Sequence, residues 1–462
     1  MNTTFWDSFQ GLTLSAQLFF ILALLIAFAF EFINGFHDTA NAVTTVIYTK
    51  TLKPTPAVIY SGIMNFLGVL LGGTTVAFSI VNLLPVDLLV EGDSLRAIVM
   101  VLSLLLTGVI WNLGTWWLGL PVSSSHTLIG SILGVGLANS LLSYGDLTGI
   151  NLSKVLDVGK ALLLSPLIGF IAAAALLLLM KTFLRDPKLY VPPVDGDAPP
   201  SWIRGALIAT CGGVSFAHGS NDGQKGMGLI LLALIGFLPT YYAMDLNHPQ
   251  LAPKVTAAAS QIETILQNEN QLSPPLRDDL QSIIASLHSA DSLASVPAED
   301  RWKVRQKIFS IKKSLSNLPL SEPAAESLTP HLKVLQHAIE YVPLWVIIGV
   351  AFALGIGTTI GYKRIVVTIA EKIGKTHLTY AQGVAAESVA AVTISFADLL
   401  HLPVSTTHVL SSGVAGTMWA NQSGIQTSTI RKILIAWVLT LPISIACSAS
   451  LFTIGCLLLG AG

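Results

Sequence analysis

Long apolar runs separated by short polar stretches make up most of this chain. A helix needs about 20 predominantly apolar residues to cross the hydrocarbon core of a bilayer, and ten segments approach or exceed that length. They lie at 14–49, 57–81, 96–119, 122–142, 155–181, 203–242, 343–361, 378–400, 404–420 and 431–461. The pattern predicts an all-α polytopic membrane protein. The first and sixth segments are the longest, and polar residues interrupt each of them near its middle.

Residues 243–340 follow a different pattern, with mixed charges, several prolines and no apolar run long enough to span. Within this stretch, apolar residues recur at helical spacing between Asp300 and Leu318, with basic residues between them. We therefore predict that 243–340 is a soluble insert of amphipathic helices. A second polar stretch, 186–201, contains five prolines and is predicted to be a linker.

Two motifs occur twice in the chain. The sequence NGFHD at 34–38 matches HGSND at 218–222, and LPVSSSH at 120–126 matches LPVSTTH at 402–408. The first pair is offset by 184 residues and the second by 282, and the difference of 98 equals the length of the predicted insert. The chain thus divides into one membrane repeat at 1–185 and a second at 202–242 and 341–462. Each repeat has five membrane segments, and the odd number predicts inverted repeats.

The charges agree with this topology and limit the possible functions. Only 11% of residues are charged, against roughly 25% in soluble domains, mean hydropathy is +0.68, and the net charge is −1. No global field therefore attracts nucleic acid. Basic residues gather in alternate loops, and the positive-inside rule then places the N-terminus, the C-terminus and the insert outside.

Polar residues at membrane depth form the first candidate site. Ionisable groups there are costly and usually functional. The set in the first long segment matches the set in the sixth: Asn34, His37, Asp38 and Asn41 correspond to His218, Asn221, Asp222 and Lys225. Glycines flank both sets. They permit broken helices whose freed backbone groups face a cavity, and we predict such a break in each repeat.

The proline and hydroxyl motifs form the second candidate site. Proline opens a helix, and serine and threonine are favoured N-cap residues. Both motifs are predicted to lie at the bends of re-entrant helical hairpins that enter from opposite faces. Helix N-termini offer free N–H groups and a positive dipole end, which suit a tetrahedral oxyanion. Nucleophilic catalysis is disfavoured because each Ser-x-His is duplicated and no strand-turn-helix elbow is present. We expect neither an enzyme nor a bound cofactor or metal.

Asp38 and Asp222 would repel an anion unless cations or protons came with it, which favours symport. Lys225 occupies the position of Asn41 in the other repeat, and a tethered ammonium there replaces one sodium ion. Protons are therefore favoured over sodium as the coupling ion.

Glu387, in an otherwise apolar segment, is a candidate proton carrier, with a polar helix contact as the alternative. A sulfate symporter, an anion channel and a membrane sensor remain alternative functions.

The motifs at 34–42, 121–126, 217–226 and 403–408 resemble those of the inorganic phosphate transporter (PiT) family, in particular its bacterial low-affinity branch. The resemblance implies phosphate import across the bacterial inner membrane by a homodimer. In that branch phosphate moves with protons, often as a neutral divalent-metal phosphate complex. Other members use sodium and have Asn where this chain has Lys225. The implied phosphate site comprises Asp38, Asn41, Ser124, Ser125, Asp222, Thr406 and Thr407.

Overall fold

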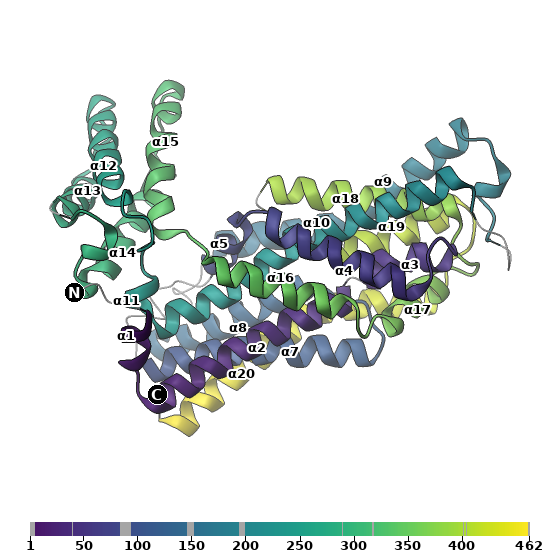
Figure 1. Ribbon diagram of the computed structural model, residues 1–462, viewed down its shortest axis with the longest axis horizontal. Helices are drawn as coiled ribbons and strands as arrows, with labels where there is room; N and C mark the ends of the chain where they lie inside the picture. The colour runs from purple at the N-terminus through teal and green to yellow at the C-terminus, as the bar shows by residue number, and fades with distance from the viewer. Residues whose placement is uncertain are drawn as a thin grey trace. The chain divides into compact units, whose positions relative to one another are not determined.

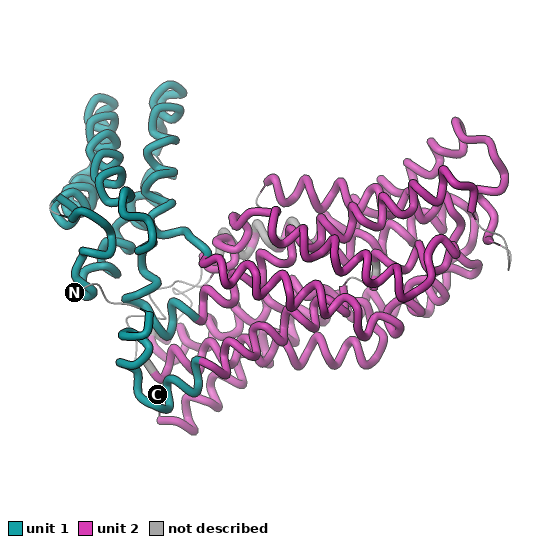
Figure 2. Tube along the Cα trace, in the orientation of Figure 1, with its two compact units in different colours: residues 1–20, 234–342 teal, residues 21–233, 343–462 magenta. Residues whose placement is uncertain are grey.

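The computed structural model describes residues 5–38, 40–83, 94–145, 152–193, 199–288, 290–316, 318–400, 402 and 404–460. Across these residues the regular structure is helical, apart from one isolated β-bridge between Gly374 and Ile425. The chain forms two compact units (Figure 2). Unit 1 comprises 1–20 and 234–342, and unit 2 comprises 21–233 and 343–462.

Unit 1 contains the stretch predicted to be a soluble insert. Its main helices are α12 (Leu251–Asn268), α13 (Pro274–Leu287), α14 (Ala298–Leu315) and α15 (Glu322–Ile339), with the short α1 (Phe5–Gln10) and α11 (Pro239–Tyr242). The apolar positions of the four long helices form one common core. Arg305 is buried against this core and donates hydrogen bonds to the carbonyls of Ala243 and Ile339 at 3.0 and 2.7 Å. The side of the membrane on which this unit lies stays a prediction.

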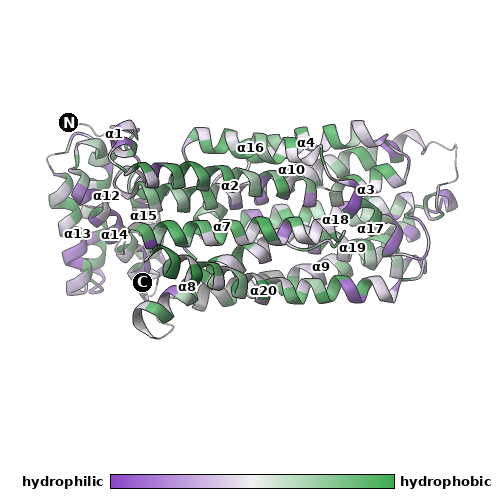
Figure 3. Cartoon of the chain, turned by 90° about the horizontal axis from the view of Figure 1, so that it is seen from below, coloured by the Kyte–Doolittle hydropathy of each residue, from purple (hydrophilic) through white to green (hydrophobic). Residues whose placement is uncertain are grey.

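Unit 2 contains most of the long apolar helices (Figure 1). They are α2 (Leu14–Asp38), α3 (Ala40–Tyr48), α4 (Pro54–Leu71), α5 (Thr75–Val81), α7 (Ser94–Trp117), α8 (Ser124–Tyr144), α9 (Leu152–Phe183), α10 (Ser201–Phe237), α16 (Leu344–Thr358), α17 (Lys363–Lys372), α18 (Tyr380–Leu399), α19 (Thr406–Ala420) and α20 (Thr427–Leu459). The ends of α2 and α10 extend into unit 1. Hydrophobic residues run along the length of helices such as α2 and α7 (Figure 3).

Within the described residues, six helices are long and apolar enough to cross a membrane, or seven if α15 and α16 are counted together. This indicates a multi-pass membrane protein. Fewer helices meet the criterion than the ten segments expected from sequence. α10, α18 and α19 coincide with expected segments, but α10 and α18 carry buried charged side chains and α19 has only 15 residues.

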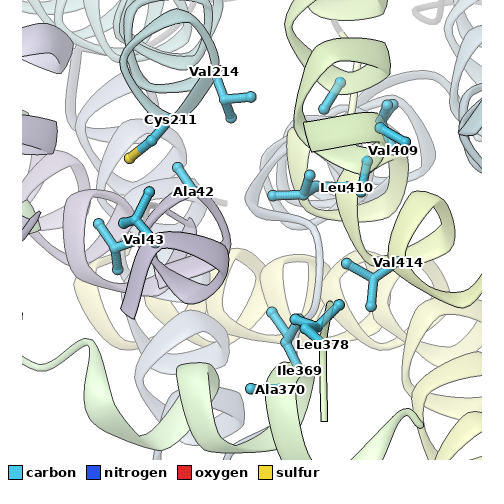
Figure 4. Close-up of a cluster of buried hydrophobic side chains, with 14 of the residues drawn as sticks. Ala42, Val43, Cys211, Val214, Ile369, Ala370, Leu378, Val409, Leu410 and Val414 are labelled. Carbon is cyan, nitrogen blue, oxygen red and sulfur yellow. The ribbon is translucent and has the colours of Figure 1, made fainter. Parts of the chain in front are cut away.

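The helices of unit 2 pair in a pattern that repeats along the chain. α8 packs against α7 and α20, while α19 packs against α18 and α9, and α4 packs against α16. Each helix that follows a hydroxyl motif therefore contacts the last long helix of the other predicted repeat. Small and branched side chains from α3, α10, α17 and α19 pack together and form a core between these four helices (Figure 4).

The sixth segment differs from the expectation of a broken helix, because α10 is continuous from Ser201 to Phe237, through the whole second motif. Its glycines serve close packing instead of unwinding. A Cβ on Gly219 would lie 2.8 Å from the Cα of Asn65, and one on Gly223 would lie 2.6 Å from a methyl group of Val69. In the first segment, α2 ends at Asp38 and α3 begins at Ala40, and Thr39 between them lies outside the described residues, so the predicted break there stays a prediction.

We expect Gly219→Ala to lower the stability of the protein by about 1–3 kcal/mol, the usual cost of overpacking a close helix contact. The added methyl group would collide with the backbone of Asn65, which cannot move aside as a flexible side chain would. Thermal unfolding of the purified protein in detergent measures the effect. Gly205→Ala is the matched control, because Gly205 is an exposed residue of α10 with nothing within 4 Å of the added atom. Equal unfolding temperatures for the two variants would contradict this role of Gly219.

Candidate functional site

The two hydroxyl motifs cap the helices that follow them. The Ser123 hydroxyl accepts a hydrogen bond from the backbone N–H of His126 at 3.2 Å and caps α8. The Ser405 hydroxyl accepts one from His408 at 3.1 Å and caps α19. Side-chain oxygens at this position satisfy one of the free N–H groups of a helix N-terminus. The expectation that these residues act as N-caps is confirmed in both motifs.

The N-termini of α8 and α19 meet in the interior of unit 2. The rings of His126 and His408 lie 4.7 Å apart, and both side chains are buried. The Ser125 hydroxyl donates a hydrogen bond to the carbonyl oxygen of Val404 at 3.0 Å. Two helix N-termini with their unpaired N–H groups and positive dipole ends therefore converge on one region.

Asp38 lies where these two helix N-termini meet, although it belongs to α2. Ser124 donates to its Oδ2 at 2.7 Å, and Thr407 donates to its Oδ1 at 2.6 Å. The Nδ1 of His37 lies 2.9 Å from the same Oδ1. One buried carboxylate thus binds a hydroxyl from each motif, and charge-assisted hydrogen bonds of this kind are stronger than neutral ones.

Asp222 and Lys225 form a buried ion pair one turn apart on α10. The Nζ of Lys225 donates to Asp222 Oδ1 at 2.6 Å, to the Ser125 hydroxyl at 2.6 Å and to the Val404 carbonyl at 2.8 Å. Lys225 is 2% exposed and Asp222 is fully buried. All three donors of the ammonium are satisfied by oxygen atoms, as a buried cation requires.

The two carboxylates are close to each other. The Ser124 hydroxyl, which donates to Asp38, also lies 3.5 Å from Asp222 Oδ2. Ligand atoms of Asp38, His218 and Asp222 all lie within 4.8 Å of one another, a grouping able to hold a metal ion. Carboxylate and imidazole ligands suit divalent cations. The Nδ1 of His218 is 2.8 Å from the side-chain oxygen of Asn65, which orients the ring.

The structure therefore brings together most of the site residues proposed from sequence: Asp38, Ser124, Ser125, Asp222, Lys225 and Thr407. Thr406 is also buried, but its hydroxyl has no hydrogen-bond partner among the described residues. The side chain of Asn41 lies outside the described part of the structure.

Glu387 belongs to a separate group of polar side chains. It is fully buried on α18 and accepts hydrogen bonds from Thr45 on α3 and from Thr210 on α10, the latter at 2.5 Å. No contact links it to Asp38, Asp222 or Lys225 among the described residues.

Sequence reasoning missed three of these partners: Asn65, Thr45 and Thr210. Asn65 was detectable in principle, because it is an isolated amide within the apolar segment 57–81. The two threonines gave no such signal, since threonine is common in helices packed inside a membrane protein.

Comparisons with known proteins agree with the geometry. Residues 34–448 match the model of the phosphate transporter family. The chain is 42% identical to a low-affinity inorganic phosphate transporter of Buchnera aphidicola subsp. Acyrthosiphon pisum, over 96% of this chain and 98% of the relative. It is 40% identical to the low-affinity inorganic phosphate transporter PitB of Escherichia coli K12, with the same coverage.

A solved structure, "The sodium-dependent phosphate transporter", has the same fold, with a TM-score of 0.56 at 20% identity, over 95% of this chain and 98% of that one. The relatives are named as transporters and not as enzymes. The family match and the identities to these relatives over nearly the whole chain show that it belongs to the phosphate transporter family.

Proposed function

We propose that this chain is a secondary active transporter that imports inorganic phosphate by symport. The observation that carries the proposal is the convergence of two capped helix N-termini on Asp38, next to the buried Asp222–Lys225 pair. The names of its relatives support phosphate as the substrate.

Phosphate would bind between the N-termini of α8 and α19. The first N–H groups of each helix have no partner within the helix and point toward a bound anion. The hydroxyls of Ser124, Ser125, Thr406 and Thr407 supply further donors. Ser124 and Thr407 now donate to Asp38, so phosphate entry would redirect their hydroxyls from the carboxylate to the anion.

The charges of the site explain the need for a co-transported ion. Two carboxylates face one ammonium, and an added phosphate would leave the buried site with excess negative charge. A proton or cation that enters with phosphate offsets this cost, and each then favours the binding of the other. Phosphate also keeps an ionisable proton that it can donate to Asp38 or Asp222, whereas sulfate at neutral pH would face these carboxylates without one. The site therefore favours phosphate over sulfate.

Lys225 supports protons over sodium as the coupling ion. Its ammonium is held by a carboxylate, a hydroxyl and a carbonyl oxygen, the ligand types that a bound alkali cation would use. A fixed ammonium leaves no place there for a mobile sodium ion. Asp38, His218 and Asp222 could bind a divalent cation that travels with phosphate as cargo.

Transport would proceed by alternating access, with the two halves of the chain as inverted repeats around the site. The packing between the halves supports this arrangement: α8 of the first half packs on α20 of the second, and α19 of the second half packs on α9 of the first. Glu387, hydrogen-bonded between α18, α3 and α10, is placed to pass a proton between helices as they move.

The test is radiolabelled phosphate uptake into liposomes that contain the purified protein, with an inward proton gradient, a sodium gradient or no gradient. We expect accumulation with the proton gradient, unaffected by excess sulfate. Accumulation only with sodium would overturn proton coupling, and rapid equilibration without accumulation would indicate a channel.

Glu387→Gln in the same assay should lose proton-driven accumulation while phosphate exchange at equal pH continues. Unchanged accumulation would assign Glu387 a purely structural role.

A further inference from the structure

Two contacts occupy equivalent positions in the two halves but differ in chemistry. Phe36 and Ser220 are 184 residues apart, the offset between the two helix motifs, and Trp116 and Asp398 are 282 apart, the offset between the hairpin motifs. Phe36 packs against Trp116, and the Ser220 hydroxyl donates a hydrogen bond to Asp398. In both halves, this pair joins the helix that carries the motif to the helix that leads into the hairpin bend.

The first contact, which we call the aromatic latch, consists of Phe36 and Trp116. Their ring centroids are 5.0 Å apart at an angle of 58°. The indole N–H of Trp116 donates to the carbonyl of Gly361 at 2.8 Å, in the turn after α16. The guanidinium of Arg364 lies over the same indole, 5.2 Å from its centre. The aromatic latch thus ties the first half to the α16–α17 turn of the second half.

The second contact, the polar latch, consists of Ser220, Gln224 and Asp398. The Gln224 amide donates to Asp398 Oδ1 at 2.8 Å and to the carbonyl of Gly72 at 3.1 Å. Its oxygen accepts a hydrogen bond from the backbone N–H of Val76 at 2.8 Å. The polar latch therefore ties the second half to the α4–α5 turn of the first half, which mirrors the arrangement of the aromatic latch.

The two turns lie toward opposite ends of unit 2, as the positions of α5 and α17 in Figure 1 show. Each latch thus contacts a turn at one end of the helix bundle. The helix that carries Asp38 also carries Phe36 of the aromatic latch, and the helix that carries Asp222 also carries Ser220 of the polar latch. The hydroxyl and amide of the polar latch are buried, whereas Asp398 is partly exposed.

We propose that the polar latch and the aromatic latch are the two gates of the transporter, and that Asp398 is the positioning residue that closes one of them. This inference rests on the proposed alternating access. Hydrogen bonds of the polar latch can be exchanged for hydrogen bonds to water, whereas separating the aromatic latch exposes apolar surface. Because only one gate is open at a time, opening the polar latch closes the aromatic latch more tightly.

The experiment is hydrogen–deuterium exchange on the purified full-length protein in detergent, read at residues 72–76 and at residues 359–364. The Val76 amide reports directly on the polar latch, because Gln224 protects it. We expect Asp398→Ala to speed exchange at 72–76 by about tenfold or more, the size of effect that loss of a hydrogen bond to a charged group produces. Exchange at 359–364 should slow in the same variant. Ser220→Ala, a smaller change, should shift both segments in the same directions by less.

Ser395→Ala is the matched control, since Ser395 is an exposed residue of α18 one turn before Asp398. Faster exchange at both segments in Asp398→Ala and Ser220→Ala would indicate simple destabilisation and overturn the gate assignment, as would no change at either segment. This readout does not depend on uptake. If the wild-type protein fails to accumulate phosphate yet Asp398→Ala shows faster exchange at 72–76 and slower exchange at 359–364, the proposed transport fails and the gates stand. Accumulation by the wild type without this pair of opposite changes in Asp398→Ala overturns the gates alone.

Discussion

Asp222→Asn is expected to lower concentrative phosphate uptake about 30-fold to 4,000-fold, because truncating one partner of a buried, hydrogen-bonded charge pair typically costs about 2–5 kcal/mol. The substitution keeps the shape of the side chain but leaves the Lys225 ammonium buried at 2% exposure without its carboxylate. It also removes one of the two carboxylates that could take up the proton of phosphate. Uptake driven by a proton gradient in proteoliposomes measures the effect.

A second variant separates loss of function from loss of folding. In Asp222→Asn with Lys225→Met, both charges are gone, so no unpaired charge is left buried. We expect the unfolding temperature in detergent to fall in Asp222→Asn and to recover in the double variant, while uptake stays strongly reduced in both. Full uptake by Asp222→Asn would contradict the assignment of Asp222 to the site.

The convergence of the two hydroxyl motifs could be predicted because each carries its own local structure. A proline followed by serine or threonine and an apolar run specifies a capped helix start from nearest neighbours alone. Ser123 and Ser405 cap α8 and α19 as such sequences should. The duplication of the motif then indicated a common site, because one shared function is the simplest explanation for two matching polar segments in an apolar chain.

The individual contacts in the site could not be predicted, because they join residues far apart in the chain. Four hydroxyls were candidates for the site, yet Ser124 and Thr407 bind Asp38, Ser125 binds Lys225, and Thr406 has no partner within the described residues. That distribution depends on how α2, α8, α10 and α19 pack. Packing geometry of this kind leaves no local pattern in the sequence.

The continuous α10 shows where the same residue type permits two structures. Glycine in an apolar helix allows either unwinding or close approach of a neighbouring helix. Gly219 and Gly223 serve close approach, to Asn65 and Val69. The sequence predicted a break because glycines flank the polar set in both long segments. Polar side chains such as Gln224 were read as part of the motif, although they bind the distant Gly72 and Asp398.

The ligands around Lys225 give the proposed preference for protons over sodium a specific physical basis. Asp222, Ser125 and the Val404 carbonyl present three oxygen atoms within 2.8 Å of Nζ. Hard cations prefer oxygen ligands of these kinds. Removing the ammonium while keeping the ligands would therefore leave a negatively charged cavity suited to a small monovalent cation.

Lys225→Asn is accordingly expected to make phosphate uptake depend on sodium, with rates at least about tenfold higher under an inward sodium gradient than without one, a preference of about 1.4 kcal/mol. Initial rates in proteoliposomes under separate proton and sodium gradients measure the change. Lys225→Met is the matched control, because it also removes the charge but adds no oxygen ligand and fills the space with an apolar chain. It should gain no sodium dependence. Proton-driven uptake that persists unchanged in Lys225→Asn would reject the idea that the ammonium stands in for a bound cation, and sodium dependence in both variants would show that loss of the charge alone is sufficient.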